Sequence, residues 1–334
     1  TSLSAFSQVY LQLTSQLRLQ AGVRYSHEKT SATSTTANTF APVAGELSSF
    51  NDPVIPGSFI SASGKKSWDK AGWKVGLDFK PTDSTMLYGY YARGFKSGGF
   101  TGRIAVAEDI GPFNPETLDT FEIGVKSDLL DRRLRINLAA FYNLYKNMQV
   151  TQNITYASGA NSATIVNAGK AKTKGVELEL TAVPVESLTL SGSLAYLDAR
   201  YTKYDTRILG PSGLVAVSYA GNRLMNAPEW SGAASLNYVT AVAGGKAALF
   251  IQDTFASSKF TNFTGLPQER VDAINLVNAN ISWTPEDEMW SVSLYGRNLF
   301  DTKYYGQKSY FAPAYATAGM GTPREYGVTF KVSW

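Results

Sequence analysis

Residues 326–334 read YGVTFKVSW, and an aromatic or aliphatic residue occupies every second position from Tyr326 to Trp334. A β-strand points successive side chains to opposite faces of its sheet, so this segment predicts a strand with one apolar face. The same alternation recurs along the whole chain, for example over residues 17–26, 73–80 and 134–143. The sequence therefore predicts an all-β protein, and no segment has a convincing helical pattern.

The connections between these segments are of two kinds. Short polar turns lie at 81–83, 130–133, 184–187, 243–245 and 285–288. Long loops rich in Gly, Ser and Asn are expected at about 28–66, 96–115, 153–168, 201–225, 261–271 and 305–322. Tight turns at one rim of an antiparallel sheet and long loops at the other are typical of a transmembrane β-barrel.

Thirteen strand segments are expected, at 3–14, 16–28, 67–80, 85–96, 116–129, 132–152, 169–183, 187–201, 228–240, 246–260, 272–284, 289–304 and 323–334. They reach or exceed the ~9–11 residues that cross a bilayer at a tilt, whereas strands of soluble sandwiches have typically about 5–6 residues. Alternation alone also fits a soluble sandwich whose polar face lies in water. The strand lengths and the unequal rims favour the antiparallel transmembrane barrel.

The composition agrees with a folded membrane β protein. Of the 334 residues, 44% are hydrophobic and 17% are charged, which excludes a disordered chain. Aromatic residues make up 13%, with 19 Tyr, as aromatic girdles at both membrane interfaces require. The net charge of +4 gives no argument for nucleic acid, and the absence of Cys excludes disulfides and thiolate chemistry.

Five motifs along the chain resemble a known family. They read YGYYARGFKSGGF (88–100), FNPET with FEIGVK (113–126), NAGKAKTKGVELE (167–179), RNLFD with Tyr304 (297–304), and PRE before the terminal strand (323–325). In this order they resemble the C-terminal half of TonB-dependent outer-membrane receptors, the iron-siderophore type in particular.

The resemblance implies a receptor domain over residues 1–334 in the outer membrane of a Gram-negative bacterium. Such a receptor takes up ferric siderophores or similar scarce chelates, with energy supplied by the TonB complex. The family's plug domain and TonB box would lie in an N-terminal part outside this sequence. The resemblance also implies contacts with membrane lipid and with the barrel-assembly machinery, and no enzyme activity.

The number of strands bears on how much of the barrel this sequence holds. Bacterial single-chain barrels have even strand numbers, and thirteen is odd. Outer-membrane transporters have about 22 strands, so we expect thirteen C-terminal strands of such a barrel. Trp334 would then mark its true end, and Thr1 would lie inside the longer chain.

Two loop regions hold candidate ligand-contacting residues. The region 93–103 offers Arg93, Lys96, Phe100 and Arg103, whose positive charge could attract an anionic ferric chelate. The last loop offers Tyr305, Tyr310, Phe311 and Tyr315, which could stack on a catecholate ligand. Alternatively, the charges are merely solvated and the aromatic residues belong to the membrane girdle.

The terminal strand holds a further candidate signal. Its residues Tyr326, Val328, Phe330, Val332 and Trp334 resemble the family's barrel-insertion signal. The alternative is an ordinary amphipathic strand.

No catalytic, cofactor-binding or metal-binding residues are predicted. His27 is the single histidine, and a metal site needs more ligands. Glu177 and Glu179 share one strand face, but no nucleophile and base accompany them. The rivals to the receptor are a passive porin and an adhesin or structural β protein, and the sequence does not identify the substrate.

Overall fold

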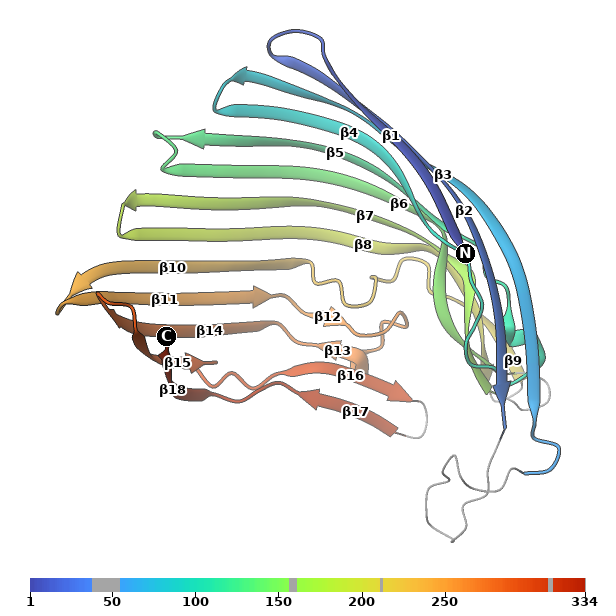
Figure 1. Ribbon diagram of the computed structural model, residues 1–334. Helices are drawn as coiled ribbons and strands as arrows, with labels where there is room; N and C mark the ends of the chain where they lie inside the picture. The colour runs from blue at the N-terminus through green and yellow to red at the C-terminus, as the bar shows by residue number, and fades with distance from the viewer. Residues whose placement is uncertain (38–54, 156–160, 211–212, 312–314, 334) are drawn as a thin grey trace.

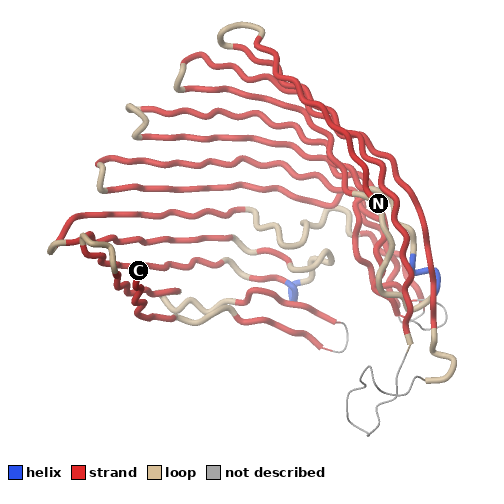
Figure 2. Tube along the Cα trace, in the orientation of Figure 1, coloured by secondary structure: helices blue, strands red, loops and turns tan. Residues whose placement is uncertain are grey.

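The computed structural model describes residues 1–37, 55–155, 161–210, 213–311 and 315–333, and it consists almost entirely of strands (Figures 1 and 2). The main antiparallel sheet has 14 strands, and all except β9 follow one another in chain order. The path comprises β1 (Ser2–Gln12), β2 (Leu17–Thr36), β3 (Ile60–Thr82), β4 (Thr85–Lys96), β5 (Glu116–Leu129), β6 (Leu134–Thr155), β7 (Asn161–Val185), β8 (Leu188–Gly210), β10 (Trp230–Val242), β11 (Gly245–Ala256), β14 (Ile274–Pro285), β15 (Trp290–Arg297) and β18 (Glu325–Val332). These are the thirteen strands that alternation predicts.

Smaller elements lie outside this path. Strand β9 (Gly213–Ser218) pairs with β8, and two separate hairpins are formed by β12 (Lys259–Phe260) with β13 (Arg270–Val271) and by β16 (Tyr305–Phe311) with β17 (Tyr315–Met320). Two 3-10 helices, η1 (Ala107–Ile110) and η2 (Pro267–Glu269), complete the described structure. None of the helices within the described ranges is long and apolar enough to cross a membrane.

The sheet is a curved wall with two unlike rims (Figure 1). The five predicted short turns are confirmed, and they lie along one rim, called here the turn side. The other rim, called the loop side, carries the longer connections, both small hairpins and both 3-10 helices. This asymmetry is the one that the sequence predicts.

The predicted extent of the long loops is wrong in several places. Strand β2 continues to Thr36 and β3 begins at Ile60, β7 begins at Asn161, and β8 continues to Gly210. The expected loop 305–322 contains the β16–β17 hairpin. The extension of β2, KTSATSTT at 29–36, consists mostly of Ser and Thr on both faces, so it shows no apolar alternation. Backbone pairing and β-branched Thr still favour strands there.

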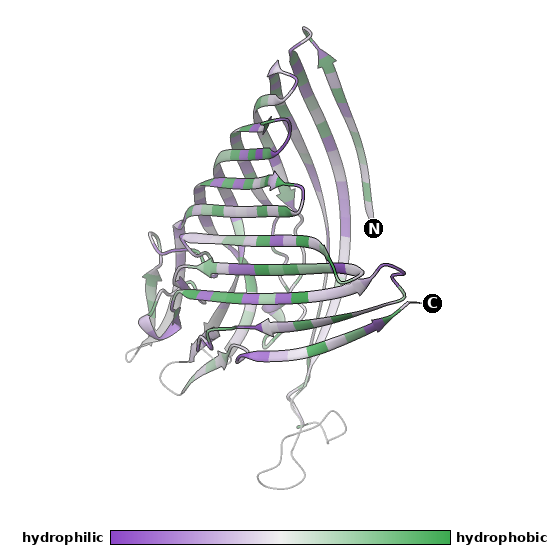
Figure 3. Ribbon diagram, turned by 90° about the vertical axis from the view of Figure 1, so that its left-hand side faces the viewer, coloured by the Kyte–Doolittle hydropathy of each residue, from purple (hydrophilic) through white to green (hydrophobic). Residues whose placement is uncertain are grey.

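The cross-strand registers separate the side chains into two faces. Val75 lies opposite Tyr91, Tyr91 opposite Phe121, and Phe121 opposite Tyr142, so all four share one face. The same register rows place further exposed large hydrophobic residues on this face, which we call the apolar face: Leu77, Ile123, Leu138, Val176, Leu194, Ile281, Leu294, Val328 and Phe330. Figure 3 shows the alternating colours along the strands. Exposed apolar side chains in continuous rows are what a lipid-facing barrel wall requires.

Candidate functional site

The opposite face of the sheet, which we call the polar face, carries hydrogen-bonded charged and aromatic residues. Glu122 accepts hydrogen bonds from the hydroxyls of Tyr88 (2.9 Å) and Tyr90 (2.7 Å). Lys126 lies 5.7 Å from the Tyr88 ring centroid, and Lys74 lies 4.0 Å from that of Tyr90. The group lies in the middle of the wall, on strands β3, β4 and β5, and forms a polar lining that a solute could contact.

Glycines on the polar face make room for these rings. A Cβ atom at Gly124 would lie 2.6 Å from atoms of the Tyr88 ring, and one at Gly327 would lie 2.6 Å from the Tyr295 hydroxyl. Each ring therefore covers the glycine of the neighbouring strand, an arrangement that shields a strand glycine from solvent. Gly124 of the motif FEIGVK thus leaves space for the ring of Tyr88, which belongs to the motif YGYYARGFKSGGF.

A second polar group lies nearer the turn side. Asp78 accepts hydrogen bonds from Arg18 (2.7 Å) and from Gln20 (3.1 Å). Asp78 is buried, whereas the Arg18 side chain is 42% exposed. The polar face therefore holds its carboxylates by hydrogen bonds and leaves basic groups accessible.

On the loop side, the segment after β4 folds against the polar face of β3. Gly99 pairs with Phe113 in an isolated bridge, and the Phe100 ring centroid lies 6.1 Å from that of buried Trp68. Ser34 donates to the carbonyl of Gly102 at 2.9 Å, which ties the segment to β2. Residues 99–102 are therefore held against β2 and β3 at the loop side of the sheet.

The predicted residues of the region 93–103 lie in different environments. The structure corrects the position of Arg93, which lies inside β4 and not in a loop. It pairs in register with Trp73 on the apolar face, and its guanidinium binds Asp119 at 2.5 and 2.7 Å. Lys96 ends β4 and is exposed, as is Arg103, while Phe100 is partly buried against Trp68.

The predicted aromatic residues of the last loop lie on the β16–β17 hairpin. Tyr305 is 41% exposed, and Lys308 lies 4.8 Å from its ring centroid. Tyr310 is partly buried, and Phe311 pairs in register with Tyr315 at the end of the hairpin. The hairpin contacts η2 and β13, and Thr261 donates to the carbonyl of Lys308.

A buried cluster near this hairpin carries no signal in the sequence. Tyr204 has no exposed surface, and its ring centroid lies 4.6 Å from that of Phe263 and 5.0 Å from that of Tyr201. A register shift near Lys170 and Ala171 brings Tyr201 and Tyr204 together although they are three residues apart. The cluster is a small core outside the sheet's apolar bands.

Glu269 fixes the loop that covers this cluster. It is 1% exposed, and it accepts hydrogen bonds from the amide of Asn262 (2.8 Å) and from the hydroxyl of Thr264. Burial and the negative charge of Glu269 raise the pKa of the Tyr219 hydroxyl. The loop-side connections therefore have their own packed structure, which can hold exposed residues at fixed positions.

Four of the five residues of the predicted insertion signal share the apolar face. Tyr326, Val328, Phe330 and Val332 are all exposed, and the Phe330 ring lies 5.8 Å from that of Trp290 on β15. Trp334 lies outside the described residues.

Comparisons with known proteins agree with this geometry. The Yersinia pestis "Pesticin receptor" is 26% identical over 337 residues, covering all of this chain and 44% of that protein. The Pseudomonas aeruginosa "Metal-pseudopaline receptor CntO" is 28% identical over 260 residues, covering 76% of this chain and 32% of that protein. The chain thus spans less than half the length of these relatives.

Solved structures show the same fold. The ferric yersiniabactin uptake receptor FyuA from Yersinia pestis superimposes with a TM-score of 0.79 at 21% identity, covering 99% of this chain and 45% of that one. The siderophore receptor PiuA from Acinetobacter baumannii gives a TM-score of 0.73 at 20% identity, with 98% and 42% covered. The family model described as "TonB dependent receptor-like, beta-barrel" matches residues 1–299. The chain therefore belongs to the TonB-dependent receptor family, in the part that forms the β-barrel.

Proposed function

We propose that this chain is part of an outer-membrane receptor that takes up ferric siderophores or similar metal chelates with energy from the TonB complex. The observation that carries the proposal is the match of 76–100% of this chain to proteins named as pesticin, metal-pseudopaline and ferric yersiniabactin receptors. No enzymatic step is involved, as the family consists of receptors. Their barrel architecture supports a location in the outer membrane of a Gram-negative bacterium.

Capture of the solute would take place on the loop side. Lys96 and Arg103 are exposed there, and Tyr305 presents an open aromatic ring. Positive charge at a mouth raises the arrival rate of an anionic chelate, and aromatic rings can stack on catecholate or aryl groups. We therefore propose these residues as first contacts, with Tyr310 beside them on the same hairpin.

The polar face would guide the solute further. Lys74, Tyr90 and Glu122 line it in the middle of the wall. The relatives are more than twice as long as the region they share with this chain. We place the gating plug and the contact with the TonB complex in that further length.

Membrane insertion is the last part of the proposal. The row of exposed apolar residues on β18 supports recognition of this strand by the barrel-assembly machinery. The same row would face lipid after insertion.

The test is growth and uptake in the host bacterium. A deletion of the gene should abolish growth on one or more defined ferric siderophores supplied as the sole iron source. Uptake of the same chelates labelled with radioactive iron should stop when a protonophore removes the energy for TonB. Uptake that continues unchanged with the protonophore would instead identify a passive porin.

A further inference from the structure

The apolar face changes from aliphatic to basic toward the loop side of β7 and β8. Tyr196 lies opposite Trp230 in one register row, with their ring centroids 4.9 Å apart. Four residues further along β8, Arg200 lies opposite Lys172 on one side and Arg223 on the other. At about 3.4 Å per residue, this row of three cations lies ~14 Å beyond the aromatic pair.

More basic residues extend this patch. Lys174 lies opposite Asp198 between the two rows, and Lys170 lies opposite Lys203 beyond them. We call Lys170, Lys172, Lys174, Arg200, Lys203 and Arg223 the basic patch. Lys170 and Lys172 are exposed, and the side chains of Lys174 and Lys203 are 57% and 59% exposed.

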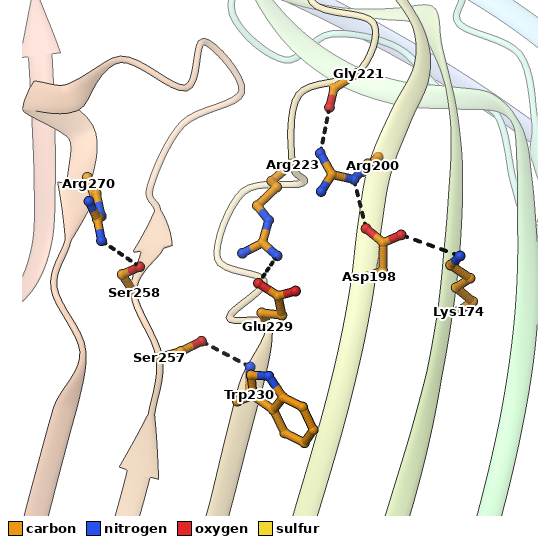
Figure 4. A network of polar contacts seen from close by, with 10 residues as sticks. All are labelled: Lys174, Asp198, Arg200, Gly221, Arg223, Glu229, Trp230, Ser257, Ser258 and Arg270. Carbon is orange, nitrogen blue, oxygen red and sulfur yellow. Dashed lines mark hydrogen bonds and ion pairs between the residues drawn. The ribbon is translucent and has the colours of Figure 1, made fainter.

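The acidic residues nearby neutralise only part of this charge. Asp198 binds Arg200 at 2.8 Å and lies 3.8 Å from Lys174, and Glu229 binds Arg223 at 2.5 Å (Figure 4). Asp205 lies 3.7 Å from Lys203. Lys170 and Lys172 have no ion-pair partner among the residues that the structure describes.

Like charges directly opposite each other destabilise a sheet. An anionic group bound from outside the protein would therefore stabilise this part of the sheet. Tyr and Trp mark the membrane interface in barrels, and the basic patch lies just beyond Tyr196 and Trp230. Lipid phosphates lie at that depth. An Arg guanidinium can bind two oxygens of one phosphate at once, and the ammonium group of each Lys adds a single positive charge. Basic pockets at the membrane surface hold lipid head groups in the same way.

We propose that the basic patch binds the phosphate groups of an anionic lipid in the leaflet on the loop side. The lipid's acyl chains lie along the Leu and Val rows below the aromatic pair, and its phosphates contact Lys172 and Arg200. Asp198 positions Arg200, since it holds the Nε atom at 2.8 Å, and the Nη1 atom donates to the Gly221 carbonyl at 3.2 Å, so that Nη2 remains for a phosphate oxygen (Figure 4). This inference depends on the membrane placement of the family and not on which solute is taken up.

The experiment uses the full receptor that contains this chain, purified in a non-ionic detergent. Native mass spectrometry would measure binding of two glycolipid probes, diphosphorylated lipid A and the same lipid with its phosphates removed. The test variant is Lys170→Gln/Lys172→Gln/Arg200→Gln. The matched control is Lys80→Gln/Lys246→Gln/Lys331→Gln, which removes the same charge from strand positions on the turn side.

The wild type and the control should prefer the phosphorylated lipid. The test variant should bind it about a hundredfold more weakly, since each basic group near an anionic lipid contributes roughly a factor of five. Resistance of the barrel to dissociation in unheated gel samples would show that the variant is folded. Equal binding of both probes by the wild type, or unchanged binding by the folded variant, would overturn the proposal and indicate a protein partner for the patch.

Discussion

The ring of Tyr88 lies across Gly124 on the neighbouring strand, so close that a Cβ atom at Gly124 would lie 2.6 Å from it. Both residues belong to sequence motifs of the family, YGYYARGF and FEIGVK. The contact explains why the second motif contains a glycine: it lets the Tyr88 hydroxyl reach Glu122.

Gly124→Ala should therefore displace Tyr88 and break its hydrogen bond to Glu122. The expected loss is about 1–2 kcal/mol of the free energy of unfolding, the usual cost of one such bond together with its desolvated partner. Urea-induced unfolding in detergent, followed by tryptophan fluorescence, would measure it. The control is Gly192→Ala, where the nearest atom would be 3.8 Å from the new Cβ. Equal stability of both variants would contradict this role for Gly124.

The ion pair of Arg93 and Asp119 is expected to be structural. Asp119 is 4% exposed and also accepts bonds from Lys146 (3.1 Å) and Tyr91 (2.9 Å). Arg93→Leu should cost about 3 kcal/mol, at the lower end for breaking a buried pair, because Lys146 remains beside Asp119.

The double variant Arg93→Leu/Asp119→Leu should recover part of that loss, since it leaves no buried charge. Arg297→Leu is the control, because this side chain is 69% exposed and lies 3.7 Å from Glu325. Its effect should stay within about 0.5 kcal/mol. The single variant Asp119→Leu completes the comparison. If the losses of unfolding free energy in the two single variants simply add up in the double variant, Arg93 and Asp119 do not stabilise each other.

Alternation identified all thirteen strands because the two faces of this wall differ so strongly in polarity. It failed beyond the apolar band, where Thr33 and Ser34 continue β2 although neither face is apolar. The strand expected at 85–96 contains Arg93, but the candidate loop region 93–103 also included it, and the structure places it in the strand. The partner that holds Arg93 on the apolar face, Asp119, is 26 residues away and is set by strand register.

The structure of the loop-side connections could not be predicted from the sequence for a different reason. Tyr204 lies on β8 and is buried against Phe263 and Tyr219, which are distant along the chain, and Glu269 is held by Asn262 and Thr264 of its own loop. Contacts of these kinds follow no local period. A register shift in β7 and β8 also changes which residues point inward. Both features depend on how neighbouring segments pack, so no single segment reveals them.

Removing the exposed charges at the mouth should slow capture of an anionic chelate. Lys96→Gln/Arg103→Gln should lower the association rate several-fold at low ionic strength and less at 0.15 M salt, because salt screens exposed charges. Stopped-flow fluorescence quenching with a growth-supporting ferric siderophore would measure the rate. The control Lys80→Gln/Lys246→Gln changes the same charge on the turn side. Rates that respond equally in both variants would exclude local steering by Lys96 and Arg103.

Glu269 should hold the loop 261–271 and, through it, the β16–β17 hairpin. Glu269→Ala removes the acceptor for Asn262 and Thr264 and leaves their polar groups unpaired. We expect faster amide hydrogen exchange and easier proteolytic cleavage in 261–271 and 305–320, with the main strands unchanged. Gln268→Ala is the matched control, because Gln268 is the exposed neighbour on the same 3-10 helix. Increased exchange in 261–271 alone would show that the hairpin is held independently, since Thr261 also contacts Lys308. Unchanged exchange in both segments would show that the Tyr204 cluster suffices to hold the loop.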